Sequence, residues 1–219
     1  MVRTCSFSLP PVNRREVLRY AGAKAETQDL RQLLEDALAE AEPVLSGAVC
    51  WQEFPLTFGD GLADLGFSRI SSESLRRNLT GCDRVILFGA TVGLGIDRLI
   101  ARYSRISPSS ALMLQAIGAE RVEALCDTFC DHIRQLYPDL HQRPRFSPGY
   151  GDFPLQTQAD IFRVLDCSRK IGLTLNQSFL MSPSKSVTAI IGLGPCCGTD
   201  HSAGCRSCGK ADCSFRRMP

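Results

Sequence analysis

Apolar residues recur with a helical period in two long segments, residues 27–45 and 108–136. A spacing of three and four residues places such side chains on one face of a helix. Both segments are therefore predicted to be helices with a buried face, and Pro108 is suited to the first turn of the second helix. The apolar positions are Leu30, Leu33, Leu34 and Leu38 in the first segment, and Leu114, Ile117, Val122, Leu125, Phe129, Ile133 and Leu136 in the second. The polar side of the second helix, with Glu123, Asp127 and Arg134, is expected to face solvent.

Three shorter segments have the composition of strands: residues 48–54, 84–88 and 186–191. Uninterrupted apolar runs of this length are typical of buried strands. Strands and helices do not alternate regularly along the chain, so the pattern favours the α+β class over a parallel, doubly wound sheet. Further helices are expected at residues 13–21, from Ser72 onward, at 96–103 and at 157–171, with Gly172 ending the last one.

The composition is that of an ordinary soluble globular protein, with 219 residues, 44% apolar and 22% charged. A net charge of +2 predicts binding neither to nucleic acid nor to a membrane surface. No apolar run approaches the roughly 20 residues that a membrane-spanning helix needs. The first residues also lack the apolar core of a secretion signal. We therefore expect a cytoplasmic protein.

Three glycines, Gly89, Gly93 and Gly95, follow the predicted strand 84–88 and precede a predicted helix. A glycine-rich turn at the N-terminus of a helix can bind phosphate. Here, however, Ile96-Asp97 stands where a P-loop has lysine and serine or threonine. The favoured interpretation is a tight turn that lets the helix pack against its strand.

The loop at residues 145–152 combines three residue types that suit a ligand site. Arg145 can bind a carboxylate or phosphate through two parallel hydrogen bonds. Gly149 lets a ligand approach the backbone, and Tyr150 can lie against a cation or a heterocycle. The pattern therefore indicates either a ligand with a carboxylate at one end and a cation or ring at the other, or a plain turn with a surface arginine.

Cysteine is the unusual residue of this chain, with 11 copies, several of them close together near the C-terminal end. In a reducing compartment, clustered cysteines are more often metal ligands or redox groups than structural disulfides. Such a cluster can hold zinc or an iron–sulfur cluster, which the pattern does not distinguish, and the alternative is a tail of free thiols. The predicted ligands are Cys196, Cys197, Cys205, Cys208 and Cys213, with His201 as a further candidate. Small core residues are expected at Cys5, Cys50, Cys82, Cys126, Cys130 and Cys167.

From Arg145 to Gly192 the sequence resembles the activation domain of cobalamin-dependent methionine synthase. The loop pattern Arg-x-x-x-Gly-Tyr of that family is carried by Arg145, Gly149 and Tyr150, and residues 172–187 match as well. The N-terminal half resembles short stand-alone members of the family. The resemblance implies a twisted, mainly antiparallel sheet flanked by helices over residues 1–192, followed by the Cys-rich tail at 193–219.

The resemblance also implies a site for S-adenosylmethionine. By it, Arg145 would bind the methionine carboxylate, while Ser147 and Gly149 would present backbone groups. Tyr150 would pack near the adenosyl or sulfonium part. Glu123 lies where the family has a glutamate near the ligand, and would take the ammonium group or a ribose hydroxyl.

In the family, Co(I) of cobalamin is sometimes oxidised to inactive Co(II), and reactivation needs one electron and the methyl group of S-adenosylmethionine. This chain has no Asp-x-His-x-x-Gly cobalamin-ligating motif. We therefore expect it to act in trans on a separate cobalamin-binding methionine synthase core, with flavodoxin or ferredoxin as the electron donor. An iron–sulfur cluster in the tail could relay that electron, whereas zinc would be structural.

Two departures from the family leave alternatives open. The aspartate that the large enzymes carry in an N-terminal segment has no identified match, and the Cys-rich tail stands where they have a tyrosine pair. The chain could instead reactivate another corrinoid methyltransferase, or be a non-catalytic metal-binding regulatory module with the same fold.

Overall fold

The computed structural model describes residues 1–23 and 25–195, which are built around an antiparallel sheet. The strand order is β1 (Arg3–Ser6), β2 (Ala48–Pro55), β6 (Arg84–Thr91), β10 (Ser186–Gly194) and β7 (His141–Gln142), and every neighbouring pair is antiparallel. Two small antiparallel sheets consist of β3 (Thr57–Gly59), β4 (Leu62–Asp64) and β5 (Arg69–Ile70), and of β8 (Thr174–Leu175) and β9 (Met181–Ser182). The predicted α+β class is confirmed.

Strand β6 lies in the middle of the main sheet and is buried on both faces. Ile86 and Phe88 point into one apolar core, whereas Val85 and Leu87 point into a second core on the opposite face. Side chains alternate between the faces of a strand, so a strand covered on both sides needs apolar residues at every position. This explains the uninterrupted apolar run in the sequence.

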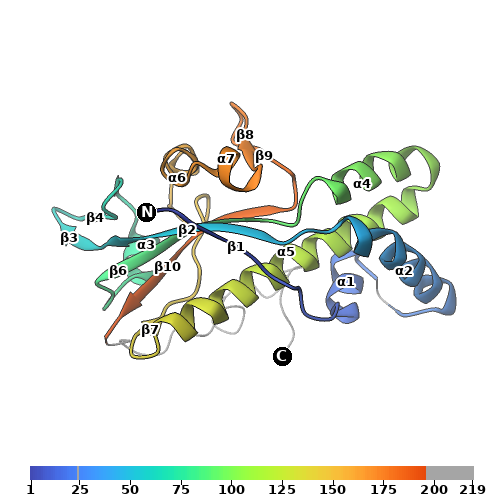
Figure 1. Cartoon of the computed structure of the whole chain (residues 1–219), viewed down its shortest axis with the longest axis horizontal. Helices are drawn as coiled ribbons and strands as arrows, with labels where there is room; N and C mark the ends of the chain where they lie inside the picture. The colour runs from blue at the N-terminus through green and yellow to red at the C-terminus, as the bar shows by residue number, and fades with distance from the viewer. Residues whose placement is uncertain (24, 196–219) are drawn as a thin grey trace.

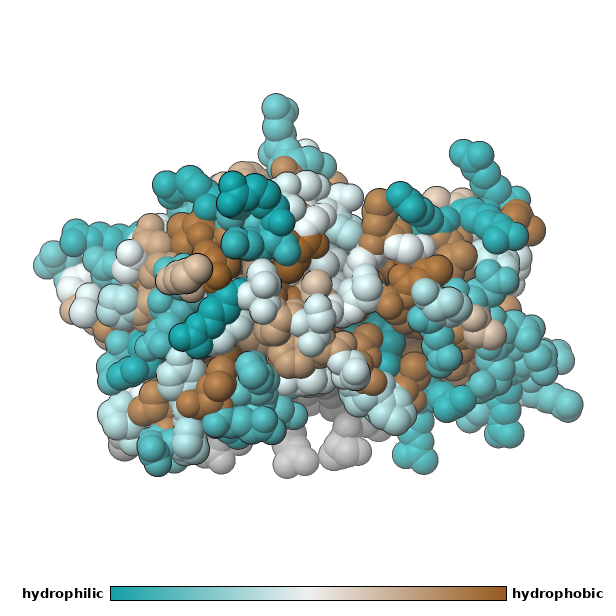
Figure 2. All heavy atoms as spheres, in the orientation of Figure 1, coloured by the Kyte–Doolittle hydropathy of each residue, from teal (hydrophilic) through white to brown (hydrophobic). Residues whose placement is uncertain are grey.

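Long helices cover one face of the sheet, with α5 (Pro108–Leu136) crossing it (Figure 1). The two ends of α5 agree with the sequence prediction, because the Ser107 hydroxyl caps the first turn and Pro108 occupies its first position. Hydrophilic side chains dominate the outer surface over α2 in Figure 2, as expected for an amphipathic helix. The other elements on this side are α1 (Arg14–Tyr20), α2 (Gln28–Ala41), the 3-10 turn η1 (Glu42–Val44) and α4 (Gly95–Ile106).

Shorter helices cover the opposite face: α3 (Glu73–Asn78), α6 (Thr157–Leu165) and α7 (Cys167–Ile171) (Figure 1). The sequence predicted one continuous helix over residues 157–171, whereas the structure has two helices there. Asp166 adopts a left-handed conformation with φ of 51° and separates α6 from α7. Aspartate tolerates this region better than most residues do. Gly172 ends α7 in the left-handed region, as predicted.

The glycine-rich segment after residue 88 also differs from its prediction. Strand β6 continues through Thr91, so Gly89 lies within the strand and not in a turn. A Cβ atom at Gly89 would lie 3.2 Å from the Cys167 Sγ, which explains a glycine in a strand at this close approach of α7. Helix α4 does begin at Gly95, where a Cβ would lie 2.4 Å from the Val44 carbonyl oxygen. A tight turn is therefore present, with Gly93 at φ of 88°, but the close approach at Gly95 is to η1 and not to the strand.

Four of the scattered cysteines are buried, as expected for small core residues: Cys50, Cys126, Cys130 and Cys167. Cys5 and Cys82 are partly buried. Within residues 1–23 and 25–195, none of the helices combines the length and the apolar character needed to cross a bilayer.

Candidate functional site

The predicted ligand loop begins as an extended segment alongside β10. The Arg143 N–H donates to the Gly192 carbonyl at 2.8 Å, and Phe146 and Ile190 exchange two backbone hydrogen bonds of 2.9 Å each. The chain then turns, and the Gly149 N–H donates to the Phe153 carbonyl at 2.8 Å. Gly149 has φ of 91°, which side chains with a Cβ rarely adopt. The loop is thus placed by the sheet edge and turned by its glycine.

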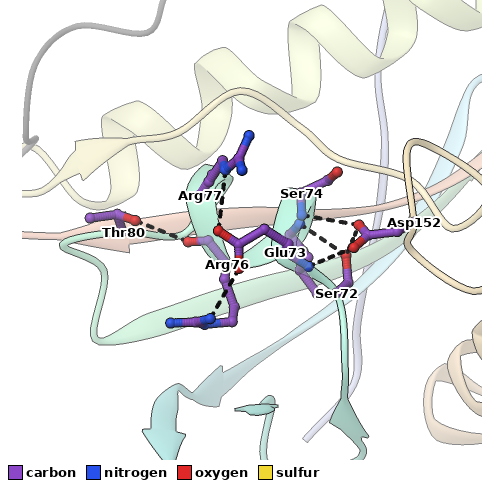
Figure 3. Close-up of polar contacts among 8 residues, drawn as sticks. Ser72, Glu73, Ser74, Arg76, Arg77, Thr80 and Asp152 are labelled. Carbon is purple, nitrogen blue, oxygen red and sulfur yellow. Dashed lines mark hydrogen bonds and ion pairs between the residues drawn. The ribbon is translucent and has the colours of Figure 1, made fainter. Parts of the chain in front are cut away.

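Asp152 anchors the far end of this loop to the start of α3 (Figure 3). Its carboxylate accepts hydrogen bonds from the Ser72 hydroxyl at 2.6 Å, the Glu73 N–H at 2.7 Å and the Ser74 N–H at 3.0 Å. These donors, the Ser72 hydroxyl foremost, hold the pKa of Asp152 well below its usual range. The ionised carboxylate therefore ties the loop to a second element.

Arg145 turns toward α5 and pairs with two carboxylates one helical turn apart. One guanidinium nitrogen donates to the Glu123 Oε2 at 2.5 Å, and another donates to an Asp127 carboxylate oxygen. Burial penalises the charged guanidinium, but its neighbours, including Glu123 and Asp127, outweigh this and raise the pKa of Arg145. Asp127 is exposed as expected, with its side chain 52% accessible. At Glu123, 32% exposed, the expectation of a solvated face was wrong, because Arg145 packs against it from 22 positions away along the chain.

Arg134, the third residue of that predicted face, is different. It pairs with Asp131 on the same helix, and its side chain is 60% exposed. For this residue the expectation of a solvated position is confirmed.

A cleft of about 720 Å³ opens beside the Arg145 cluster. Four of the five residues predicted to bind the ligand line it, namely Arg145, Ser147, Tyr150 and Glu123, while Gly149 forms the turn between them. Tyr150 is 60% exposed at this cleft. The pKa of its hydroxyl is raised, mainly by the burial of the rest of the side chain and secondly by the nearby Glu123 carboxylate. The residues that the sequence predicted to bind a ligand therefore lie together at one cleft.

A second, acidic cleft of about 540 Å³ adjoins the first. The two share Tyr20, Glu123 and Asp127 in their linings. Glu16, Glu120 and Asp131 contribute further carboxylates to the second cleft. The Glu123 and Asp127 carboxylates therefore lie where two hollows of the surface meet.

Cys130 also lines the larger cleft, with its Sγ 4.0 Å from an Arg145 nitrogen. Burial raises the pKa of Cys130 despite the adjacent guanidinium, and burial likewise raises the pKa of Cys126. Both groups therefore stay as neutral thiols near neutral pH, so neither is suited to act as a nucleophile.

Sequence reasoning missed several cleft residues. Asp127 follows Glu123 by one helical turn, a spacing that could have indicated a second carboxylate beside Arg145. Gln158 at the start of α6 and Thr188 in β10 carry no such signal, because they enter the cleft only through the packing of α6 on the sheet. The remaining missed lining residues with polar side chains are Arg19, Tyr20, Arg134, Gln142 and Ser186.

The predicted metal ligands Cys196, Cys197, Cys205, Cys208 and Cys213 lie outside the described residues, as does His201. Within residues 1–23 and 25–195 there is no group of three or more His, Cys, Asp or Glu side chains arranged to hold a metal ion. The metal or iron–sulfur site in the tail stays a prediction.

Comparison with known proteins gives a family and a fold. Residues 75–197 match the family described as "Vitamin B12 dependent methionine synthase, activation domain", which is more than half of the chain. The crystal structure of the MetH reactivation domain bound to AdoHcy aligns with a TM-score of 0.66 and 17% sequence identity, over 90% of this chain and 80% of that one. The predicted fold of a mainly antiparallel sheet flanked by helices is confirmed. No curated protein matches the chain.

Proposed function

We propose a function from the premise that the chain belongs to the vitamin B12-dependent methionine synthase activation domain family. The protein binds S-adenosylmethionine in the cleft beside Arg145. It thereby supports the reductive methylation of cob(II)alamin carried by a separate methionine synthase core. Electrons come from a small donor protein such as flavodoxin or ferredoxin.

The observation that carries this proposal is the Arg145–Glu123–Asp127 cluster at the cleft. The methionine end of S-adenosylmethionine has an ammonium and a carboxylate on one carbon atom. A guanidinium beside two carboxylates offers complementary charges for both groups, since carboxylates accept from ammonium and guanidinium donates to carboxylate. The cluster therefore suits the zwitterionic end of an amino acid better than it suits a simple anion.

The rest of the loop is suited to position the ligand. Ser147 and Tyr150 line the same cleft, and the left-handed Gly149 brings backbone close to it without a side chain. When bound, S-adenosylmethionine supplies the methyl group, which is transferred in line from a sulfonium that already activates it. The residues of this chain then hold and orient the ligand, a task that requires no acid–base pair.

Calorimetric titration with S-adenosylmethionine tests the binding step. We expect Arg145→Ala to weaken binding by about 1.5–3 kcal/mol, or one to two decades in affinity, because a charge-assisted pair is lost. Arg145→Lys keeps the charge without the planar fork and should fall in between. Arg69→Ala removes another arginine–carboxylate pair, with Asp64 in the small sheet, and serves as the matched control. A wild-type protein that does not bind would overturn the proposal and favour the regulatory module.

The second step is tested by adding the protein to a methionine synthase core whose cobalamin is in the inactive Co(II) state, together with a reductant. Recovery of turnover that depends on S-adenosylmethionine and is lost in Arg145→Ala supports the proposal. Binding without recovery would shift the assignment to another corrinoid methyltransferase.

A further inference from the structure

Buried polar atoms without a partner gather at the same cleft. In a folded protein such atoms are uncommon, because removing a polar atom from water without giving it a hydrogen bond is unfavourable. Among the residues that the structure describes, four side chains with such an atom line the cleft beside Arg145: Arg19, Gln142, Gln158 and Thr188. Their unmet hydrogen-bonding capacity marks this cleft as a place where another molecule completes the contacts.

Thr188 and Gln158 are the most deeply placed of these residues, with exposures of 2% and 7%. The Thr188 Oγ1 and the Gln158 Oε1 find no hydrogen-bond partner in the described part of the chain. Both oxygens accept hydrogen bonds, and the two residues come from different elements, β10 and α6. The Gln158 oxygen can only accept, whereas the Thr188 hydroxyl can accept or donate, so a ligand that satisfies both residues must present at least one donor.

The edge of β10 adds backbone groups at the same place. Ile190 directs both its N–H and its C=O toward Phe146 in the loop. Since backbone groups point to the same side at every second residue of a strand, the N–H and C=O of Thr188 face the same edge. Within the described residues, strand pairing along this edge is seen at residues 193–194 and at Ile190, and Ser186, Val187 and Thr188 line the cleft beyond it.

We propose that Gln158 and Thr188 bind the adenine base of the ligand and select it by its 6-amino group; this inference rests on the proposed function. The amino group donates to the Gln158 side-chain oxygen, and the Thr188 hydroxyl and backbone edge pair with the remaining polar atoms of the base. A glutamine amide is complementary to the amino edge of adenine. The methionine end then lies at the Arg145 cluster. The base is bound by α6 and β10, and the methionine end by the loop and α5.

Calorimetric titrations of the full chain test this assignment with S-adenosylhomocysteine and with S-inosylhomocysteine, in which an oxygen replaces the 6-amino group. We expect the wild-type protein to bind the adenosyl compound about tenfold more tightly, because the oxygen of the inosyl base faces an acceptor. Gln158→Leu should weaken binding of the adenosyl compound about five- to tenfold and reduce the preference. Thr188→Val, which keeps the shape of the side chain, should weaken it by a similar factor.

Two control variants remove the same groups elsewhere. Gln32→Leu changes an exposed glutamine of α2, and Thr174→Val changes an exposed threonine of β8. Thermal melts of all variants separate loss of binding from loss of folding. Variants at Gln158 and Thr188 that bind like the wild type would overturn this assignment and leave the proposed function standing. A wild type that binds both compounds equally would overturn the selection of adenine, and one that binds neither compound nor S-adenosylmethionine would overturn both proposals.

Discussion

The cleft beside Arg145 has two walls, and different interactions hold each wall in place. The helical wall is the stretch of α5 that carries Glu123 and Asp127, and it belongs to a 29-residue helix whose opposite side is buried in the larger core. The loop wall, residues 145–152, has no helix or strand of its own and is fixed by hydrogen bonds to Ile190 at one end and to α3 at the other. One wall is placed by apolar packing and the other by polar anchors.

This difference assigns separate tasks to the two regions. The helical wall is part of the main core, so its carboxylates keep their positions as long as the domain is folded. The loop wall depends on a few local interactions, so it can be disturbed without unfolding the protein. Changes behind the helical wall should therefore act on stability, while changes in the loop wall should act on ligand affinity.

The largest effect is expected behind the helical wall. Phe129 is fully buried against the Phe88 ring, with 4.8 Å between their centroids, and also contacts Trp51. Phe129→Ala should lower the free energy of unfolding by about 3–5 kcal/mol, measured by urea denaturation, because a cavity replaces the ring. Leu112→Ala at an exposed position of the same helix is the control and should change stability by less than about 0.5 kcal/mol. Similar values for both variants would break the comparison.

The next effect concerns the turn of the loop wall. Gly149→Ala forces a Cβ onto a backbone with φ of 91°, which should cost about 1–3 kcal/mol. Because the loop is anchored locally, we expect most of this strain to weaken the binding of S-adenosylmethionine and not the stability of the fold. Calorimetric titration measures the binding, and a thermal melt of the same variant measures the stability. Gly59→Ala, where a Cβ would meet nothing within 4 Å, is the control and should bind like the wild type. Full loss of folding in Gly149→Ala would show that the loop is not a separate unit.

The smallest effect is a pH dependence of the loop anchor. The pKa of Asp152 is lowered from its usual value of 3.8, chiefly by the Ser72 hydroxyl, so the carboxylate stabilises the fold at neutral pH. This contribution is lost as the pH falls below about 4 toward the lowered pKa, because the unfolded chain then binds the proton more readily. The melting temperature of Asp152→Asn should therefore lie below that of the wild type at neutral pH and approach it in acid. Asp139→Asn controls for the loss of a surface charge, and a gap that stays constant with pH would exclude the proposed anchor.

Most of the fold could be predicted from the sequence where a long pattern meets a clear boundary. Helix α5 has a sustained apolar stripe and Pro108 in its first turn, so both of its ends were predicted. Strand β1 was not, because its four residues are mostly exposed and show no periodicity. The break at Asp166 was also missed, since the apolar spacing continues across it while the backbone conformation depends on tertiary packing.

The candidate site could be predicted only where residues are neighbours in the chain. The Arg145 loop is local, and its pattern gave four of the residues that line the cleft or shape its turn. The pairing of Arg145 with Asp127, and the shared cleft that Gln158 and Thr188 line, join distant segments. Such pairs follow from the register of the loop on β10 and from the packing of α6. Neither can be predicted from residues that are neighbours in the sequence.

The strand order of the main sheet has a consequence for how the protein behaves among copies of itself. Exposed sheet edges are templates for pairing with other chains, and short or charged edge strands reduce that hazard. Here the longest strands, β2, β6 and β10, lie inside the sheet, while the edge strands β1 and β7 have four and two residues. The two outermost strands of the sheet are therefore short, which limits the length of regular strand that another copy of the chain could pair with.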